Sequence, residues 1–301
     1  MRTVAVLLST YNGEKYLEEL IESILKQEKV NVKLFIRDDE SSDSTVSIIN
    51  KYKNENIKII QGKNIGPQKS FLKLIKVSEK ADYYAYCDQD DVWYTDKLYS
   101  AIECIEKETE DEPALYMSSY EVVDSELNHM YDYDMHFEKK LRLEETLVFR
   151  APSGCTMVFN EKLRDILKRT NPYYIRMHDF WTLMVAEAVN AKIITDDVPR
   201  IKYRQHGNNT VAINATIAVR AKRLLRSAIE GNNERWQQAQ SLYLEKDNIP
   251  MTERSIETLK KVVCYRNGIM NRFKLAFDPQ FKTYKKYINI LFKTAVLLGI
   301  F

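Results

Sequence analysis

The sequence predicts an α/β fold built on a doubly wound, mostly parallel β-sheet. Short apolar runs alternate along the chain with longer segments whose apolar residues repeat at helical spacing. The apolar runs are nearly continuous, as expected of strands that are buried on both faces. Several of them end in polar or acidic loops. This alternation is typical of a sheet that carries helices on both faces.

The first part of the chain is expected to form four strands, over residues 4–8, 32–36, 57–60 and 83–87. Three helices are expected to connect them. The first covers 14–27, the second begins at a cap at Ser42 or Asp43 and runs to about 53, and the third covers 64–77. Gly13 closes the loop after the first strand, and we expect it to let the backbone approach a ligand closely.

The second part is expected to contain strands over 114–119, 156–159, 192–195 and 199–203, with a helix over 179–189. A segment over 127–141, rich in Tyr, His and Asp, is interpreted as a loop. From residue 215 onward the pattern is helical, with helices predicted over 217–229, 234–244, 252–273 and 281–298. Pro250 and Pro279 mark the breaks between the later helices.

Composition describes one large domain, or one domain with an appendage. The chain has 301 residues, of which 45% are hydrophobic and 29% are charged. Its four cysteines show no CxxC spacing and indicate reduced thiols in a cytosolic protein. We identify no signal peptide and no apolar stretch of about eighteen residues, the length of a transmembrane helix. We therefore expect a soluble protein, or one attached to a membrane from the cytosolic side.

Charge is distributed unevenly along the chain. The net charge is +2, but residues 215–301 hold 16 basic and 7 acidic residues, and residues 1–214 hold 29 basic and 36 acidic ones. We place a domain boundary there, between a sheet-containing domain (1–214) and a basic helical region (215–301). A basic region suggests an anionic partner, and nucleic acid is a poor candidate because the first domain is acidic.

Three carboxylates, Asp88, Asp90 and Asp91, directly follow the expected buried strand 83–87. Acids at the carboxyl end of a central strand lie where open α/β sheets bind ligands. Like charges in such a cluster raise one another's pKa unless a cation neutralises them. Mg²⁺ or Mn²⁺, with oxygen ligands and bound phosphates, fits best. The alternative is a solvated acidic turn that caps the helix beginning near Thr95.

A second acidic loop follows the strand 32–36 and should lie at the same edge of the sheet. There Asp38 and Asp39 could accept hydrogen bonds from a pyrimidine N3–H or a ribose hydroxyl. Helix capping is the alternative for the acids between 38 and 43.

Two further segments carry candidate chemistry. Asp179 begins a predicted helix, whose dipole favours its ionised form, so it could act as a general base; the alternative is a capping residue beside the buried Trp181. His206 follows a strand and could bind a metal or hydrogen-bond a diphosphate, although a lone histidine there is often structural. Arg204 could neutralise a departing diphosphate.

The motifs at 8–13, 36–45 and 87–93, in this order and spacing, resemble those of the inverting family-2 glycosyltransferases. The resemblance covers roughly residues 1–210 and is strongest to the bacterial rhamnosyltransferase-like branch that builds cell-wall, capsule and O-antigen polysaccharides. It implies a GT-A fold, a nucleotide-sugar donor and a divalent metal. It also implies that Asp88 and Asp90 are the first and last acids of the DxD motif, with Asp90 the metal ligand and His206 a second candidate, and that Asp179 is the catalytic base. The residues placed on the donor side are Thr10, Tyr11, Asn12, Asp38, Asp39, Asp88, Gln89 and Asp91. Those placed on the acceptor or diphosphate side are Trp93, Ser153, Gly154, His178, Trp181 and Arg204.

The resemblance implies dTDP-L-rhamnose as donor and a glycan or polyprenyl-diphosphate-linked glycan as acceptor. Other nucleotide sugars, such as a UDP-hexose, remain open at this point. The QxxRW signature of processive members is absent, which favours addition of one sugar at a time. A catalytically silent scaffold subunit is an alternative, and a nucleotidyltransferase fits poorly because the loop 9–13 has one glycine and no arginine.

The last predicted helix, 281–298, mixes lysine with aromatic and aliphatic residues. Such a composition is typical of a helix that lies on an anionic membrane surface. The competing interpretation is a helical bundle that packs on the first domain or on a second subunit of a homo-oligomer.

Overall fold

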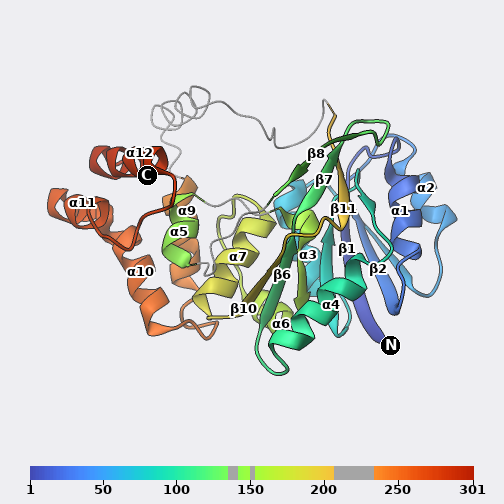
Figure 1. Cartoon of the computed structure of the whole chain (residues 1–301), viewed down its shortest axis with the longest axis horizontal. Helices are drawn as coiled ribbons and strands as arrows, with labels where there is room; N and C mark the ends of the chain where they lie inside the picture. Colours follow the sequence, from blue (N-terminus) through green and yellow to red (C-terminus); the bar gives the residue numbers. More distant parts are fainter. Residues whose placement is uncertain (135–141, 150–152, 207–233) are drawn as a thin grey trace.

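A computed structural model describes residues 1–134, 142–149, 153–206 and 234–301. Its centre is a seven-stranded sheet with the order β10-β6-β9-β4-β1-β2-β3 (Figure 1). Neighbouring strands are parallel except β9, which is antiparallel to β4 and β6. The strands are β1 (Arg2–Thr10), β2 (Val30–Asp38), β3 (Ile57–Gln61), β4 (Tyr83–Cys87), β6 (Ala114–Ser118), β9 (Val158–Asn160) and β10 (Lys192–Asp196). The predicted mostly parallel sheet is confirmed.

Helices cover both faces of this sheet because the central strand β1 is apolar on both sides. Val4, Val6 and Leu8 belong to one buried cluster, and Ala5 and Leu7 belong to the other. The first cluster includes residues of α1 (Leu17–Leu25), α2 (Thr45–Lys51) and α4 (Lys97–Glu108). The second includes residues of α3 (Gly66–Val77), α5 (Leu143–Val148), α6 (Glu161–Arg169) and α7 (His178–Ala188).

The register of the sheet brings the loops of three strands together. Thr10 at the end of β1 pairs with Asp38 at the end of β2, and Leu8 pairs with Cys87 at the end of β4. The polar loops that follow these strands therefore meet at one edge, as the sequence predicts.

A second, four-stranded sheet was not expected. Its order is β5-β11-β7-β8, with β5 (Val92–Trp93), β7 (Tyr120–Val123), β8 (His129–Tyr133) and β11 (Ile201–Arg204). The sequence analysis assigned residues 127–141 to a loop, but 129–133 form a strand antiparallel to β7. Stacked Tyr120 and Tyr133, with ring centroids 4.7 Å apart, stabilise that pairing.

The C-terminal helices pack directly on the sheet-containing part. They are α9 (Glu234–Leu244), α10 (Glu253–Cys264), α11 (Ile269–Ala276) and α12 (Lys286–Leu298). Leu259 and Val262 share a buried cluster with α5 and α7, and the Arg235 guanidinium donates to the Leu147 carbonyl at 2.6 Å. The packing matches the bundle interpretation of these helices.

The C-terminal helices are shorter than the sequence predicts at one point. The single helix predicted over 252–273 is wrong, because the chain breaks at Gly268, whose φ of +145° is incompatible with an α-helix. The predicted helix 217–229 and the boundary at 214/215 lie outside the described residues. Within the described ranges, the search for a helix both long and apolar enough to cross a membrane found none.

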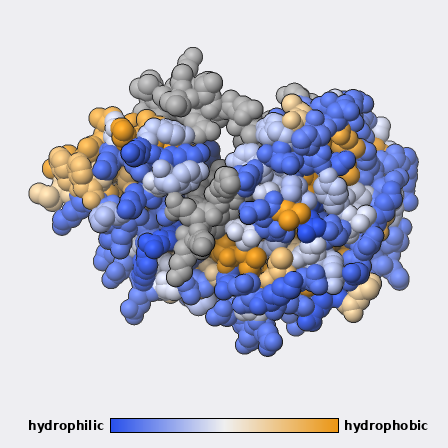
Figure 2. Space-filling view, in the orientation of Figure 1, coloured by the Kyte–Doolittle hydropathy of each residue, from blue (hydrophilic) through white to orange (hydrophobic). Residues whose placement is uncertain are grey.

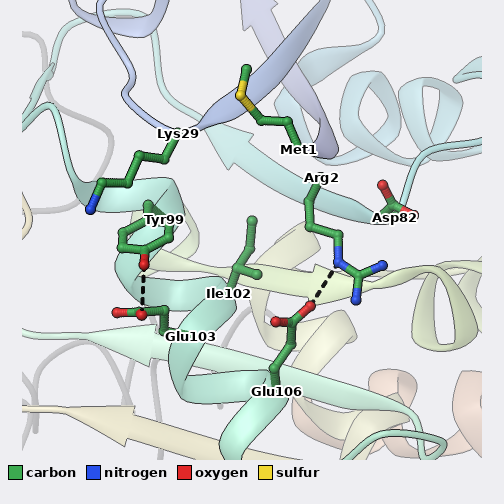
Figure 3. A pocket seen from close by; sticks show the side chains of 8 residues that line it. All are labelled: Met1, Arg2, Lys29, Asp82, Tyr99, Ile102, Glu103 and Glu106. Carbon is green, nitrogen blue, oxygen red and sulfur yellow. Dashed lines mark hydrogen bonds and ion pairs between the residues drawn. The ribbon is translucent and has the colours of Figure 1, made fainter.

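A hollow of about 590 Å³ opens at the amino edge of the sheet, where β1 begins (Figure 3). Two of its acids have partners in the lining: Arg2 forms an ion pair with Glu106 at 2.8 Å, and the Tyr99 hydroxyl donates to Glu103 at 2.7 Å. The acidic loops lie at the opposite ends of the strands.

Candidate active site

The loop after β1 is held by the loop after β4. The Tyr11 N–H donates to Gln89 Oε1 at 2.8 Å, and Gln89 Nε2 donates back to the Tyr11 carbonyl at 3.0 Å. A Cβ on Gly13 would lie 2.6 Å from Gln89 Oε1. Gly13 thus leaves room for the Gln89 amide, and the close approach of a ligand there stays a prediction. The Tyr11 side chain itself is 49% exposed.

Asn12 links the same loop to the segment after β2. Its φ of +47° is a left-handed conformation that asparagine tolerates. The Asn12 side-chain oxygen accepts from the Ser42 N–H at 2.8 Å, and the Asn12 N–H donates to Ser41 Oγ at 2.9 Å. Asn12 thus braces the loop.

Asp38 and Asp39 are both buried at the end of β2. Asp38 accepts from Thr10 Oγ1 at 3.1 Å and from the Ser41 N–H at 3.0 Å. Asp39 forms an ion pair with Arg37, whose pKa is lowered by burial. In the described structure both carboxylates hold loops in place, so their contact with a base or ribose stays a prediction.

Asp88 and Asp91, in the loop after β4, differ in how deeply they are buried. Asp88 is half-buried, and burial, followed by the charges of Asp90 and Asp179, raises its pKa to about 7. Asp91 has no exposed surface; one of its oxygens accepts from the Arg204 N–H at 3.2 Å, and its pKa is raised well above the usual range by burial. In the described structure Asp91 supports the loop, and its contact with the donor stays a prediction.

Beneath this loop lies a buried lysine that the sequence analysis missed. Burial lowers the pKa of Lys97 to about 8, and its Nζ lies 3.4 Å from the centroid of the Trp93 ring. Trp93 is buried in the core under this contact and does not face an acceptor site. Its predicted acceptor role is therefore corrected to a packing role.

His206 and Arg204 reach the acidic loop from β11. His206 Nε2 lies 2.8 Å from Asp90 Oδ2. The guanidinium of Arg204 donates to the Asp90 carbonyl at 2.8 Å, to the Ser125 carbonyl at 2.6 Å and to the Glu19 carboxylate at 2.6 Å. Arg204 is buried and these contacts fix the loop, so its contact with a diphosphate stays a prediction.

Asp179 lies in the first turn of α7 and faces Gly154. Its carboxylate accepts from the N–H groups of Phe180, at 2.6 Å, and of Gly154. Burial raises its pKa to about 6, and these two hydrogen bonds limit the rise. A Cβ on Gly154 would lie 3.2 Å from Asp179 Cβ and 2.6 Å from His178 Nε2, so only glycine allows this approach.

The remaining predicted acceptor-side residues are mostly buried. His178 stacks on Phe71 with ring centroids 3.7 Å apart, and burial lowers its pKa to about 3, so its imidazole is neutral. Trp181 has no exposed surface, and its indole N–H donates to Thr170 at 3.3 Å. Both therefore position the first turn of α7. Ser153 is half-buried and donates to the Tyr120 hydroxyl at 3.4 Å.

The acidic loop suits a hard divalent cation. Ligand atoms of Asp88, Asp91 and Cys155 lie within 4.8 Å of one another. Burial keeps the Cys155 thiol protonated by raising its pKa well above the usual range. The available donors are therefore carboxylate oxygens and the imidazole of His206, which Mg²⁺ or Mn²⁺ accepts and which lack the thiolate character of a zinc site.

The structure thus gathers Asp88, Asp90, Asp179, His206 and Gly154 at one edge of the sheet. Lys97, Cys155 and Tyr16 also belong to this region but were missed; Tyr16 lies under His206 with ring centroids 5.1 Å apart. Their sequence context carries no distinguishing signal. The pair Arg37–Asp39 could have been found, because Arg37 directly precedes the acids that it neutralises.

Comparisons with known proteins agree with this geometry. The family described as "Glycosyl transferase family 2" matches residues 5–167. The dTDP-rhamnosyl transferase RfbG of Shigella flexneri is 31% identical over 235 residues, which are 72% of this chain and 78% of that protein. The UDP-Glc:alpha-D-GlcNAc-diphosphoundecaprenol beta-1,3-glucosyltransferase WfaP of Escherichia coli is 33% identical over 112 residues, 36% of this chain and 43% of that protein.

Among solved structures, residues 1–349 of S. aureus TarS superpose with a TM-score of 0.61. That match covers 100% of this chain and 81% of the TarS chain, at 18% sequence identity. The GT-A fold implied by the motifs is thereby confirmed.

Proposed function

The chain belongs to glycosyl transferase family 2, and from this membership we propose that it is a metal-dependent, inverting transferase of one sugar at a time. The donor that we propose is dTDP-L-rhamnose. The acceptor is a lipid-linked or growing glycan of a cell-wall, capsule or O-antigen polysaccharide. We place the reaction in the cytoplasm, at the inner face of the cell membrane.

The observation that carries the proposal is the convergence of acidic groups from separate elements at one edge of the sheet. Asp88 and Asp90 come from the loop after β4, and Asp179 comes from α7. The charges of Asp90 and Asp179 nevertheless both raise the pKa of Asp88. Lys97 offsets only part of this charge, because the pKa of Asp88 stays raised. Such a cluster of acids is expected where a cation and a diphosphate bind. Asp90 and His206 would hold the metal, which when bound would neutralise the negative charge of the diphosphate.

Asp179 supplies the base. With a pKa of about 6, its carboxylate is mostly ionised at neutral pH and still accepts a proton from an acceptor hydroxyl in the transition state. The hydroxyl oxygen forms a bond to the anomeric carbon while the bond from that carbon to the diphosphate oxygen breaks. The proton goes to Asp179, and the nucleoside diphosphate leaves with the electron pair. A single displacement of this kind inverts the anomeric centre.

Support for the donor comes from the likeness to RfbG, whose name states a dTDP-rhamnosyl transferase and which this chain matches over most of its length. A UDP-hexose is the second candidate, favoured by the shorter match to WfaP, whose name states UDP-glucose. The name of WfaP also includes a diphosphoundecaprenol-linked acceptor, which supports a lipid-linked acceptor here.

Thermal unfolding in the presence of dTDP-, UDP- and GDP-linked sugars, each with and without Mn²⁺, tests the proposal. A ligand that binds only the folded state raises the Tm; at a concentration of about 100 Kd the gain is about 2.7 kcal/mol. We expect dTDP-rhamnose with Mn²⁺ to protect the wild type and to protect Asp90→Ala much less.

Asp165→Asn, an exposed acid on α6, is the matched control and should behave as the wild type. Protection by UDP-sugars alone would show that the donor is a UDP-sugar and not dTDP-L-rhamnose. An absence of protection by every nucleotide sugar would refute the transferase proposal and favour a scaffold subunit.

A further inference from the structure

The C-terminal helices α11 and α12 present an apolar surface to solvent. On α11 the exposed fractions are 60% for Ile269, 65% for Met270 and 48% for Phe273, and Phe277, which directly follows the helix, is 59% exposed. Ile269 and Phe273 are four apart and so lie on one face of α11. On α12, Ile290 and Leu298 are 64% and 63% exposed and stand eight residues apart. We call these six residues the α11–α12 face.

The α11–α12 face is not required for the packing of its own helices. Leu275 and Ala276 of α11, and Phe292 and Val296 of α12, are buried on the other side. The two helices contact each other and lie at the end of the molecule farthest from β1 and β2 (Figure 1). Figure 2 shows hydrophobic residues gathered at that end. A contiguous exposed apolar surface of this kind marks an interaction site.

The segment that carries this face is basic, and Lys274 and Lys293 are exposed on the same two helices. Residues 265–301 contain seven Lys and Arg and a single acid, Asp278, which is already paired with Lys261 at 2.7 Å. Lys293 Nζ lies 5.2 Å from the ring centroid of Phe277. Lysine stems that lie along apolar groups while the ammonium stays in water are suited to the boundary between lipid chains and anionic headgroups.

We infer that the α11–α12 face docks on the surface of an anionic lipid bilayer. The apolar side chains would enter the headgroup boundary, and the lysines and arginines of this segment would contact the lipid phosphates. A second copy of this chain fits less well, because a two-fold interface would bring two surfaces of the same positive charge together. The inference rests on the proposed function only for its biological setting, since lipid binding needs no donor or metal.

Co-sedimentation of the full chain with vesicles tests this inference. One set of vesicles is pure phosphatidylcholine and the other contains about one third phosphatidylglycerol, the anionic lipid that the basic residues should attract. We expect binding to the anionic vesicles that weakens with added salt, and little binding to the neutral ones. Phe273→Ser/Phe277→Ser and Lys274→Gln/Lys293→Gln should each reduce the anionic-vesicle partition coefficient about tenfold or more.

The matched controls change the same residue classes elsewhere. Leu25→Ser/Val77→Ser alters apolar side chains that are 47% and 45% exposed on α1 and α3, and Lys53→Gln/Lys73→Gln removes two exposed charges. Both should bind vesicles as the wild type does. Circular dichroism melting confirms that each variant is folded, and sedimentation velocity reports its oligomeric state.

Equal binding to neutral and anionic vesicles, equal loss in the controls, or no vesicle binding would each overturn the inference. A dimer that dissociates in Phe273→Ser/Phe277→Ser and does not bind vesicles would assign the face to a subunit interface. Protection by nucleotide sugars is measured separately, so a failure of lipid binding leaves the transferase proposal standing, and the reverse also holds.

Discussion

The two edges of the central sheet use similar charged residues in opposite ways. At the amino edge, Arg2 and Glu106 are 57% and 42% exposed and neutralise each other at 2.8 Å. At the carboxyl edge, Asp88 is half-buried beside further carboxylates, and its pKa rises to about 7. The Arg2–Glu106 pair at the first edge is solvated, whereas Asp88 at the second is desolvated and lies near the like charges of Asp90 and Asp179.

The comparison indicates where the chain gives up stability for function. A folded chain gains little from a solvated pair and loses little when the pair is removed. A cluster of buried acids is unfavourable on its own and persists where a bound ligand or metal offsets the cost. We therefore interpret the hollow at the amino edge, with a volume of about 590 Å³, as a surface feature.

The largest expected effect at the carboxyl edge comes from Asp179→Asn. Loss of the general base should lower kcat by about 10²- to 10⁴-fold, with the donor that protects best in the thermal assay as substrate. The wild-type rate should rise with pH through about 6, because Asp179 accepts a proton only after it has lost its own. Asp179→Asn should lack this rise.

Initial rates between pH 5 and 8 provide the measurement, with Asp165→Asn as a control that keeps the wild-type profile. Donor protection in Asp179→Asn should be unchanged, which separates catalysis from binding. A wild-type pH profile in Asp179→Asn would remove this residue from the proton transfer.

Whether a residue at the carboxyl edge could be predicted depends on how far apart in the sequence its contacts lie. Asp88, Asp90 and Asp179 were found because each sits at the end of a strand or the start of a helix, which are local patterns. The burial of Asp91 could not be predicted, because it depends on the N–H of Arg204, 113 positions away. The same holds for Lys97, whose helical position gives no sign that its ammonium faces Trp93.

In the fold as well, features with a local sequence pattern were predictable and those that depend on distant contacts were not. The apolar runs of the parallel strands and the alternation with helices were predictable from periodicity. The four-stranded second sheet was not, because β5 has two residues and β8 mixes Tyr with polar residues whose pairing becomes apparent only against β7. The break at Gly268 was missed because one glycine within a helical pattern is often tolerated.

A smaller effect, of opposite sign, is expected for the stability of Asp88→Asn. A carboxyl whose pKa is higher in the folded than in the unfolded chain destabilises the fold once it is ionised. Removal of its charge should therefore stabilise the metal-free protein at pH 8 by about 1 to 3 kcal/mol. The gain should vanish at about pH 2.5, well below the pKa of an unfolded aspartate, where the carboxyl is protonated in both states.

Urea unfolding with EDTA at the two pH values measures this difference. The stabilised variant should also lose most of the protection that Mn²⁺ and donor give to the wild type. Destabilisation at pH 8 would mean that Asp88 makes a favourable contact that outweighs the charge repulsion, and the contrast between the two edges would fail there.

The smallest effect is expected at the amino edge, for Glu106→Gln. The carboxylate accepts from Arg2 and from the Tyr83 hydroxyl, at 2.8 and 3.2 Å, but both ends of the ion pair are exposed. The free energy of unfolding should therefore change by less than about 0.5 kcal/mol, and transferase rates and donor protection should equal those of the wild type. Arg2→Gln should behave in the same way. In the double variant, the coupling between the two changes in the free energy of unfolding should also stay below about 0.5 kcal/mol. A loss of donor protection in either variant would make the hollow of Figure 3 part of the functional site, because Arg2 begins β1 and the acidic loops lie where β1 and its neighbours end.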